Sequence, residues 1–263
     1  MDLTSNDTRT KTLMRQQSIK NFKIKMAFQP IVDIFKHKIV AYEALVRGEL
    51  GEPAQDILSS VDACHQYQFD QQCRFRAIQT AVALQLKNQL FVNFCPNVIK
   101  SPSLHMQSLN QLTNHFNFPK TQLVLELTES EEIIDLNKVI KLRQYYQENG
   151  LKVAIDDFGS GYAGLGWLVK IHPDVVKLDM SLVENVDQDK YKKAIIQGII
   201  VTCEQLNIML LAEGVETMME YWTLKKLGIR YMQGYLFAKP QLGSLTHSLK
   251  PLPKHPSRNR HSA

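Results

Sequence analysis

The sequence predicts an α/β fold in which helices alternate with about eight strands that close into a barrel. Three features predict it: two adjacent apolar runs near the start, a regular alternation of helix-like and strand-like segments after them, and acidic residues at the ends of many strands. Alternation of this kind produces parallel βαβ units. Because carboxylates from many different strands must reach one site, a closed barrel is favoured over an open sheet.

The first predicted element is an antiparallel hairpin. Its strand-like runs, 26–34 and 38–46, are joined by a connection far shorter than the roughly 10–12 residues of a parallel crossover. Helices are expected after it at 53–63, 67–88, 103–116, 135–149, 162–170, 190–206 and 217–227. They alternate with strands expected at 90–94, 122–127, 152–155, 174–178, 208–212 and 230–232.

Length and charge indicate one large domain with basic ends. The 263 residues are 44% apolar, which is ample for a sizeable core. The net charge is +5, but it is concentrated at the two ends of the sequence, and the stretch between them is slightly acidic. We therefore expect a basic extension at 1–25, a folded domain at 26–245 and a basic, disordered tail at 246–263. A nucleic-acid polymer is not an expected partner.

The cysteine pattern and the hydropathy of the sequence indicate in which cellular compartment the protein is expected. None of the four cysteines forms a Cys-x-x-Cys pair, and no histidine pair has zinc-binding spacing. The N-terminal residues lack the apolar core of a signal peptide, and no run of about 18 apolar residues occurs. We expect a reduced, cytoplasmic protein without a membrane span.

Polar residues at strand ends predict the chemistry. The acidic sites are Glu43, Glu126, the pair Asp156 and Asp157, and Glu213. Asn93 and Glu126 lie within apolar runs, where an unpartnered polar group costs several kcal/mol. A hydrogen bond or an arginine could satisfy any one of them, but clustered carboxylates repel one another unless cations lie among them. An all-oxygen ligand set suits Mg²⁺ or Mn²⁺ rather than zinc. The pattern predicts metal-assisted hydrolysis of a phosphodiester.

A glycine-rich turn follows the aspartate pair and has competing interpretations. Gly159, Gly161 and Gly164 match G-x-G-x-x-G, and Asp179 follows at about the spacing of a dinucleotide-binding unit. The two aspartates would repel a pyrophosphate unless metal ions reverse the local field. Asp-Phe-Gly also occurs in protein kinases, but the other kinase motifs are missing. In a third interpretation the glycines only form the turn between a strand and a helix, and this interpretation is compatible with a metal site at the aspartates.

Three further charged residues are candidates for the same site. Lys177 stands inside a strand, where a lysine needs a carboxylate or phosphate partner. Glu216 follows a strand end. Instead of a role in the site, it could simply be an acidic residue in the first turn of a helix, where a negative charge is favourable. Arg47 lies four residues after Glu43, so both side chains share one face of a strand. The arginine could grip a phosphate or form a salt bridge with Glu43, and both interpretations stay open.

These motifs together resemble the EAL domain family of cyclic di-GMP phosphodiesterases over residues 26–242. The matching stretches are Gln29-Pro-Ile, Glu43-Ala-Leu-Val-Arg47, Asn93, Glu126-Leu-Thr-Glu129, Asp156-Asp-Phe-Gly-Ser-Gly-Tyr162, Val176-Lys-Leu-Asp179, Ala212-Glu-Gly-Val-Glu-Thr217 and Gln233-Gly-Tyr235. The resemblance implies a modified TIM (β/α)8 barrel with one antiparallel strand. It also implies hydrolysis of cyclic di-GMP to linear pGpG with two divalent cations, Mg²⁺ or Mn²⁺, and a homodimer formed through the glycine-rich loop and the helix after it.

The resemblance also implies a role for each site residue. One ion would be held by Glu43, Asn93, Glu126 and Asp156, and the second by Asp156 and Asp157. Glu213 would position or deprotonate the attacking water, Lys177 would stabilise charge on the phosphoryl oxygens, and Glu216 would orient Lys177. The positions expected to contact substrate are Gln29, Leu45, Arg47, Asp179 and Gln233, while Glu129 would anchor the mobile loop.

Two other functions stay open. The chain could be a non-catalytic cyclic di-GMP receptor or partner-binding module, or it could hydrolyse another dinucleotide. The sequence departs from the common family pattern at Cys95, Gly48 and the pair Ala163-Gly164. None of these departures removes a charge or a metal ligand, so we expect catalysis.

Overall fold

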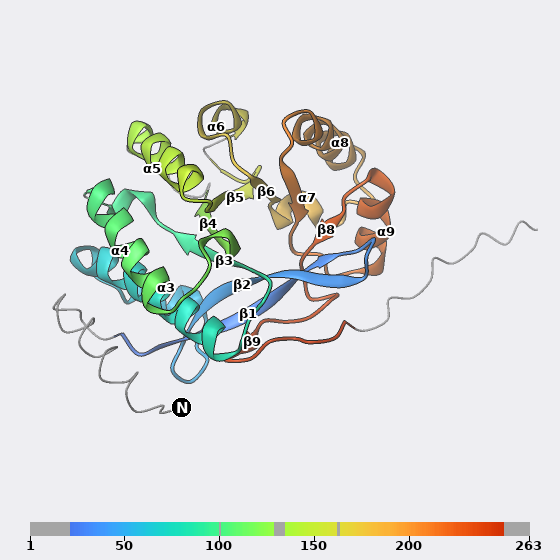
Figure 1. The fold of residues 1–263 in the computed structure, drawn as a ribbon. Helices are drawn as coiled ribbons and strands as arrows, with labels where there is room; N and C mark the ends of the chain where they lie inside the picture. Colours follow the sequence, from blue (N-terminus) through green and yellow to red (C-terminus); the bar gives the residue numbers. More distant parts are fainter. Residues whose placement is uncertain (1–21, 100, 129–134, 162–163, 250–263) are drawn as a thin grey trace, which may run out of the picture.

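The chain forms a closed eight-stranded barrel surrounded by helices in the computed structural model, which describes residues 22–99, 101–128, 135–161 and 164–249 (Figure 1). Strand order around the barrel is β2-β3-β4-β5-β6-β7-β8-β1, and β1 pairs back to β2. The barrel strands are β1 (Ile24–Asp33), β2 (Lys38–Gly48), β3 (Gln89–Phe94), β4 (Leu123–Thr128), β5 (Lys152–Phe158), β6 (Val175–Leu178), β7 (Met209–Ala212) and β8 (Tyr231–Met232). The predicted barrel is confirmed.

One strand runs against the others, as expected. β1 is antiparallel to both of its neighbours, with Ile24 opposite Gly48 on β2 and Val32 opposite Met232 on β8. The remaining neighbours are parallel. A short strand that the sequence did not predict, β9 (Gln241–Leu242), pairs with β1, with Leu242 opposite Ala27 and Gln241 opposite Phe28.

Helices cover the outside of the barrel (Figure 1). They are α2 (Ala54–Ser59), α3 (Gln66–Ala83), α4 (Pro102–His115), α5 (Leu136–Glu148), α6 (Gly164–Ile171), α7 (Met180–Val183), α8 (Lys190–Gln205) and α9 (Met218–Leu227). Short 3-10 turns lie at Ala63–His65, Pro96–Val98 and Lys120–Gln122. Within the described residues, no helix is both long enough and apolar enough to cross a lipid bilayer.

Local hydrogen bonds and backbone conformation set the ends of α9 and α2. Thr217 and Glu220 form a reciprocal capping box at the start of α9, and Gly228 ends this helix with a φ of 109°. The helix expected at 53–63 is shorter than predicted. The hydroxyls of Ser59 and Ser60 donate to carbonyl oxygens one turn back, a local bond that competes with helix propagation.

Two apolar layers hold the fold together. The larger one lies between the strands and the helices. The smaller one fills the inside of the barrel and consists of Ile31, Ala41, Phe91, Val124, Ala154, Val175 and Leu211, with Tyr231 packed against it. Each of these residues comes from a different strand, so they form a floor across the barrel.

Four predictions fall wholly or partly outside the described residues. They are the loop anchor Glu129, the first two residues of the helix expected at 162–170, most of the basic extension at 1–25 and most of the basic tail at 246–263.

Candidate active site

A ring of polar residues lies directly above the apolar floor. Successive side chains on a strand point to opposite faces, so residues two apart lie on the same face. Two residues beyond each floor residue on the parallel strands and on β2, the chain places a polar side chain. On β1, which runs the other way, the polar residue comes two positions before Ile31. The ring consists of Gln29, Glu43, Asn93, Glu126, Asp156, Lys177, Glu213 and Gln233.

Lys177 is the centre of this ring. Its side chain is fully buried, and its Nζ lies 2.5 Å from Glu126, 2.7 Å from Glu213, 2.8 Å from Asp156 and 3.6 Å from Glu43. One ammonium group therefore compensates carboxylates from β2, β4 and β5 and that of Glu213, the residue after β7.

Burial and mutual repulsion control the charges of these groups. Burial is the largest influence on Glu126 and Glu213, and it raises the pKa of both well above the usual value for a glutamate. Burial alone would lower the pKa of Lys177. The four neighbouring carboxylates outweigh it and raise the pKa of Lys177 well above its usual value. The lysine therefore stays charged.

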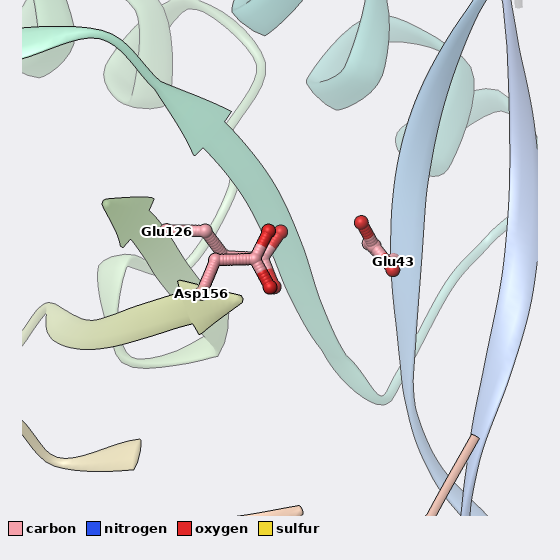
Figure 2. A group of neighbouring side chains, drawn as sticks. All are labelled: Glu43, Glu126 and Asp156. Carbon is pink, nitrogen blue, oxygen red and sulfur yellow. The ribbon is translucent and has the colours of Figure 1, made fainter. Parts of the chain in front are cut away.

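The carboxylates form two groups that share one residue. Glu43, Glu126 and Asp156 have oxygens within 4.8 Å of one another, and so do Asp156, Asp157 and Glu213. In Figure 2, Glu43 faces Glu126 and Asp156 from the other side of the first group. Asp156 belongs to both groups, which is the arrangement that two neighbouring cations need.

A backbone irregularity lets the adjacent residues Asp156 and Asp157 reach the same site. The pairing between β5 and β6 shifts between Ile155 and Phe158, and Asp157 has a φ of 54°. The hydroxyl of Thr128 donates to Asp157 Oδ2 over 3.2 Å. Burial, followed by repulsion from Asp156 and Asp179, raises the pKa of Asp157 to about 6.

The donor set fits a hard divalent cation. All the candidate ligands are oxygen donors, and Mg²⁺ and Mn²⁺ prefer carboxylate and amide oxygens. Glu126 is completely buried, and its Oε2 accepts no hydrogen bond from any described residue. Asn93 is opposite Glu126 on the neighbouring strand and is exposed at the mouth of the barrel, on the same face of β3 as Phe91.

A buried amide, that of Gln233, holds Glu43 from the other side, and a second buried amide, that of Gln29, holds Gln233. Gln233 Nε2 donates to Glu43 Oε2 over 2.5 Å and to Gln29 Oε1 over 3.1 Å. Gln29 Nε2 in turn donates to the carbonyl oxygen of Ala238 over 3.2 Å. The sequence suggested only substrate contacts for the two glutamines. The contact by which Gln233 orients Glu43 was missed, and so was the contact by which Gln29 holds Gln233, although the two-residue offset of Gln233 from Tyr231 places it in the ring.

The other predicted residues lie around this ring. Arg47 Nη1 donates to the carbonyl oxygen of Val46, and the structure forms no salt bridge between Arg47 and Glu43. Leu45 is half-buried on β2. Asp179 caps α7 by accepting from Ser181 N. Glu216 is exposed and is not among the four carboxylates that contact Lys177.

The model of one protein family matches most of the chain. It is the EAL domain model, and it matches residues 13–240. The chain belongs to the EAL domain family. Among solved structures, this EAL domain is similar to a standalone EAL protein from Vibrio cholerae O395 in its cyclic di-GMP-bound form. The TM-score is 0.84, with 40% identity over 88% of this chain and 98% of the other.

Other relatives of the EAL domain are longer proteins. The manganese and cyclic di-GMP complex of Klebsiella pneumoniae BlrP1 matches with a TM-score of 0.81 and 32% identity over 90% of this chain and 60% of BlrP1. The blue light- and temperature-regulated antirepressor BluF of Escherichia coli is 34% identical over 83% of this chain and 55% of BluF. The cyclic di-GMP phosphodiesterase NbdA of Pseudomonas aeruginosa is 26% identical over 86% of this chain and 30% of NbdA. The chain therefore spans only about a third to a half of these two curated relatives.

Proposed function

We propose that this EAL domain hydrolyses cyclic di-GMP to linear pGpG with two divalent cations, Mg²⁺ or Mn²⁺. The observation that carries the proposal is the pair of carboxylate groups that share Asp156, with Lys177 in contact with both. The substrate is supported by the relatives: NbdA is named as a cyclic di-GMP phosphodiesterase, and the V. cholerae and BlrP1 structures contain cyclic di-GMP.

The ligand sets follow from the two groups. Glu43, Asn93, Glu126 and Asp156 would hold one ion, and Asp156 with Asp157 would hold the other. Divalent cations bound there would acidify a water molecule and offset charge on the phosphoryl oxygens. The BlrP1 complex with manganese supports this assignment.

The protein's own groups would move the proton and stabilise the charge. Glu213 would take the proton of the attacking water; burial raises its pKa, which makes its ionised form a stronger proton acceptor. Lys177 stays protonated and would face the charge that develops on the phosphoryl oxygens. Glu216, which is exposed, stays the residue expected to orient Lys177.

Residues at the mouth would bind the rest of the substrate. Arg47 is unpaired with Glu43, so its guanidinium can meet a phosphate in two parallel hydrogen bonds. Gln29, Leu45, Asp179 and Gln233 are the other proposed contacts. Glu129 is proposed to anchor the glycine-rich loop.

A turnover assay tests the proposal. Purified chain is incubated with cyclic di-GMP and Mn²⁺ or Mg²⁺, and pGpG is measured by chromatography with and without EDTA. We expect pGpG that disappears with EDTA and in Asp156→Asn. Binding of cyclic di-GMP without pGpG under either metal would contradict catalysis. A panel of other cyclic and linear dinucleotides would show whether a different substrate is preferred.

A non-catalytic binding module is the second candidate, because BluF is named as an antirepressor. The retained carboxylate groups favour catalysis over this candidate. Cyclic di-GMP binding that is unchanged by Glu213→Gln, with no product formed by either protein, would favour the binding module.

A homodimer through the glycine-rich loop and α6 is also proposed. Leu165 and Val169 of α6 support it, because these apolar side chains are 63% and 72% exposed. Light scattering of the wild type and Val169→Glu tests this proposal. A monomeric wild type would contradict it.

A further inference from the structure

A buried ion pair lies behind the strand that carries Asn93. Asp70 and Arg74 are one turn apart on α3, and Arg74 Nη1 lies 2.5 Å from Asp70 Oδ2. The side chains are only 10% and 2% exposed. From the sequence, an acid and an arginine four residues apart on a helix predict an ordinary surface pair.

The pair contacts the two residues that follow Asn93. The backbone N–H of Cys95 donates to Asp70 Oδ1 over 3.2 Å, and the guanidinium of Arg74 lies 5.6 Å from the centre of the Phe94 ring. One carboxylate and one guanidinium therefore hold a backbone amide and a side chain at the end of β3.

The other side of Phe94 is closed by α4 and α5. His105 and Tyr146 pack against the ring at centroid distances of 5.1 and 6.1 Å. The Tyr146 hydroxyl and His105 Nε2 are hydrogen-bonded over 2.7 Å. Burial, with the charge of Arg74, lowers the pKa of His105 to about 2, so the histidine is neutral and adds no second cation beside Arg74. Phe94 cannot shift without disturbing three helices.

Burying the Asp70–Arg74 pair in this space is energetically unfavourable compared with filling it with apolar side chains. Removing two charges from water costs several kcal/mol per ion, and well-packed apolar residues often stabilise a fold as much or more. Arg74 Nη2 is buried and makes no hydrogen bond to any described residue. Stability alone therefore does not account for the pair, whereas precise placement of the chain beside a ligand does.

We propose that Asp70 and Arg74 are positioning residues that fix Asn93 for the ion it shares with Glu43, Glu126 and Asp156. This inference rests on the proposed function, because it assumes that Asn93 binds an ion. The pair acts through the Cys95 amide and the Phe94 ring, and it does not touch the substrate or the ions.

The positioning role of Asp70 and Arg74 can be tested by measuring Mn²⁺ binding to the metal-free, folded protein with isothermal titration calorimetry. The double variant Asp70→Asn/Arg74→Met removes both charges at similar volume and leaves no lone buried charge. We expect the ion at Asn93 to bind roughly 10–100-fold more weakly, which is typical when a supporting residue of a ligand is lost. Turnover should recover at saturating Mn²⁺, with KM for cyclic di-GMP little changed.

A milder variant and a matched control sharpen the test. Arg74→Lys keeps the charge without the planar contact to Phe94, so it should weaken Mn²⁺ binding in the same direction by less, and it carries the test if the double variant does not fold. The control is the pair Arg143 and Asp174, which also links a helix to a backbone N–H, that of Val153, but at the opposite end of the barrel. Arg143→Met/Asp174→Asn should lower the melting temperature without changing Mn²⁺ affinity.

Asn93→Ala separates this inference from the proposed function. If Asn93→Ala leaves Mn²⁺ affinity unchanged, the ligand set of the proposed function fails. If Asn93→Ala weakens binding but folded variants at Asp70 and Arg74 do not, only the positioning role fails. An equal loss in the Arg143 and Asp174 control would also overturn the positioning role. Support requires that adding Asn93→Ala to the double variant causes little further loss.

Discussion

Replacing Lys177 with methionine is expected to destabilise the metal-free protein strongly. The lysine side chain is fully buried, and its ammonium lies within 2.5–3.6 Å of four carboxylates. Removing one partner of a buried ion pair costs about 3–5 kcal/mol, because the remaining charge stays buried without compensation. At the 2–4 °C per kcal/mol typical of a chain near this length, the melting temperature should fall by roughly 6–20 °C.

The assay is thermal unfolding in EDTA and in Mn²⁺. Mn²⁺ should raise the melting temperature of Lys177→Met more than that of the wild type, because an added cation takes over the missing positive charge. Lys25→Met is the matched control, since Lys25 is also a strand lysine but is exposed on β1. The control should differ from the wild type by less than about 2 °C.

The pH dependence of the variant provides a second check. Burial raises the pKa of Glu126 and Glu213 in the folded state. A carboxyl group with a raised folded pKa favours folding below its unfolded pKa, and this contribution is lost as pH rises through the folded value. In the wild type the charge of Lys177 lowers the pKa of both carboxyl groups, so its loss raises both pKa values further, and the stability deficit of Lys177→Met should shrink as pH falls from 8 toward 5. An unchanged melting temperature in EDTA, or a deficit that grows at low pH, would refute the reasoning.

Three other predictions concern the metal site. Asp156→Asn should abolish both turnover and Mn²⁺ binding, because it alters the carboxylate shared by both groups; a folded variant with near-wild-type turnover would contradict this ligand assignment. Asp157 must lose a proton to bind an ion, so below its pKa of about 6 the affinity for the second ion should fall by up to about tenfold per pH unit in calorimetry, and a flat profile would contradict that role. Gln233→Leu frees Glu43 Oε2 from its amide donor and should weaken Mn²⁺ binding by roughly tenfold, whereas unchanged binding would show that the amide does not orient Glu43.

Strand periodicity made most of the site readable from the sequence. Glu126 and Lys177 each interrupt an apolar run, and a polar residue at an inward position of a buried strand must meet a partner or a ligand. Because parallel strands all point their carboxyl ends the same way, such residues gather at one mouth of the barrel. The eight strands and the antiparallel hairpin were likewise predictable from alternation and from the short connection between the first two strands.

Contacts between residues that only the closed barrel brings together could not be predicted from the sequence. The sequence suggested a phosphate or carboxylate for Lys177 but could not show that three strands and the residue after β7 aim carboxylates at it. It also gave no sign that β5 breaks its regular pairing so that Asp156 and Asp157 both enter the site. Asp70 and Arg74 look like a solvated helix pair until the fold places the end of β3 over them.

The most direct test of the central claim is a crystal structure of the chain with Mn²⁺ and cyclic di-GMP, with the anomalous signal of manganese measured. The account predicts two anomalous peaks beside one phosphodiester, the first within coordination distance of Glu43, Asn93, Glu126 and Asp156 and the second within reach of Asp156 and Asp157. A cyclic di-GMP complex with no manganese at Asp156, or with manganese bound only elsewhere on the molecule, would contradict it.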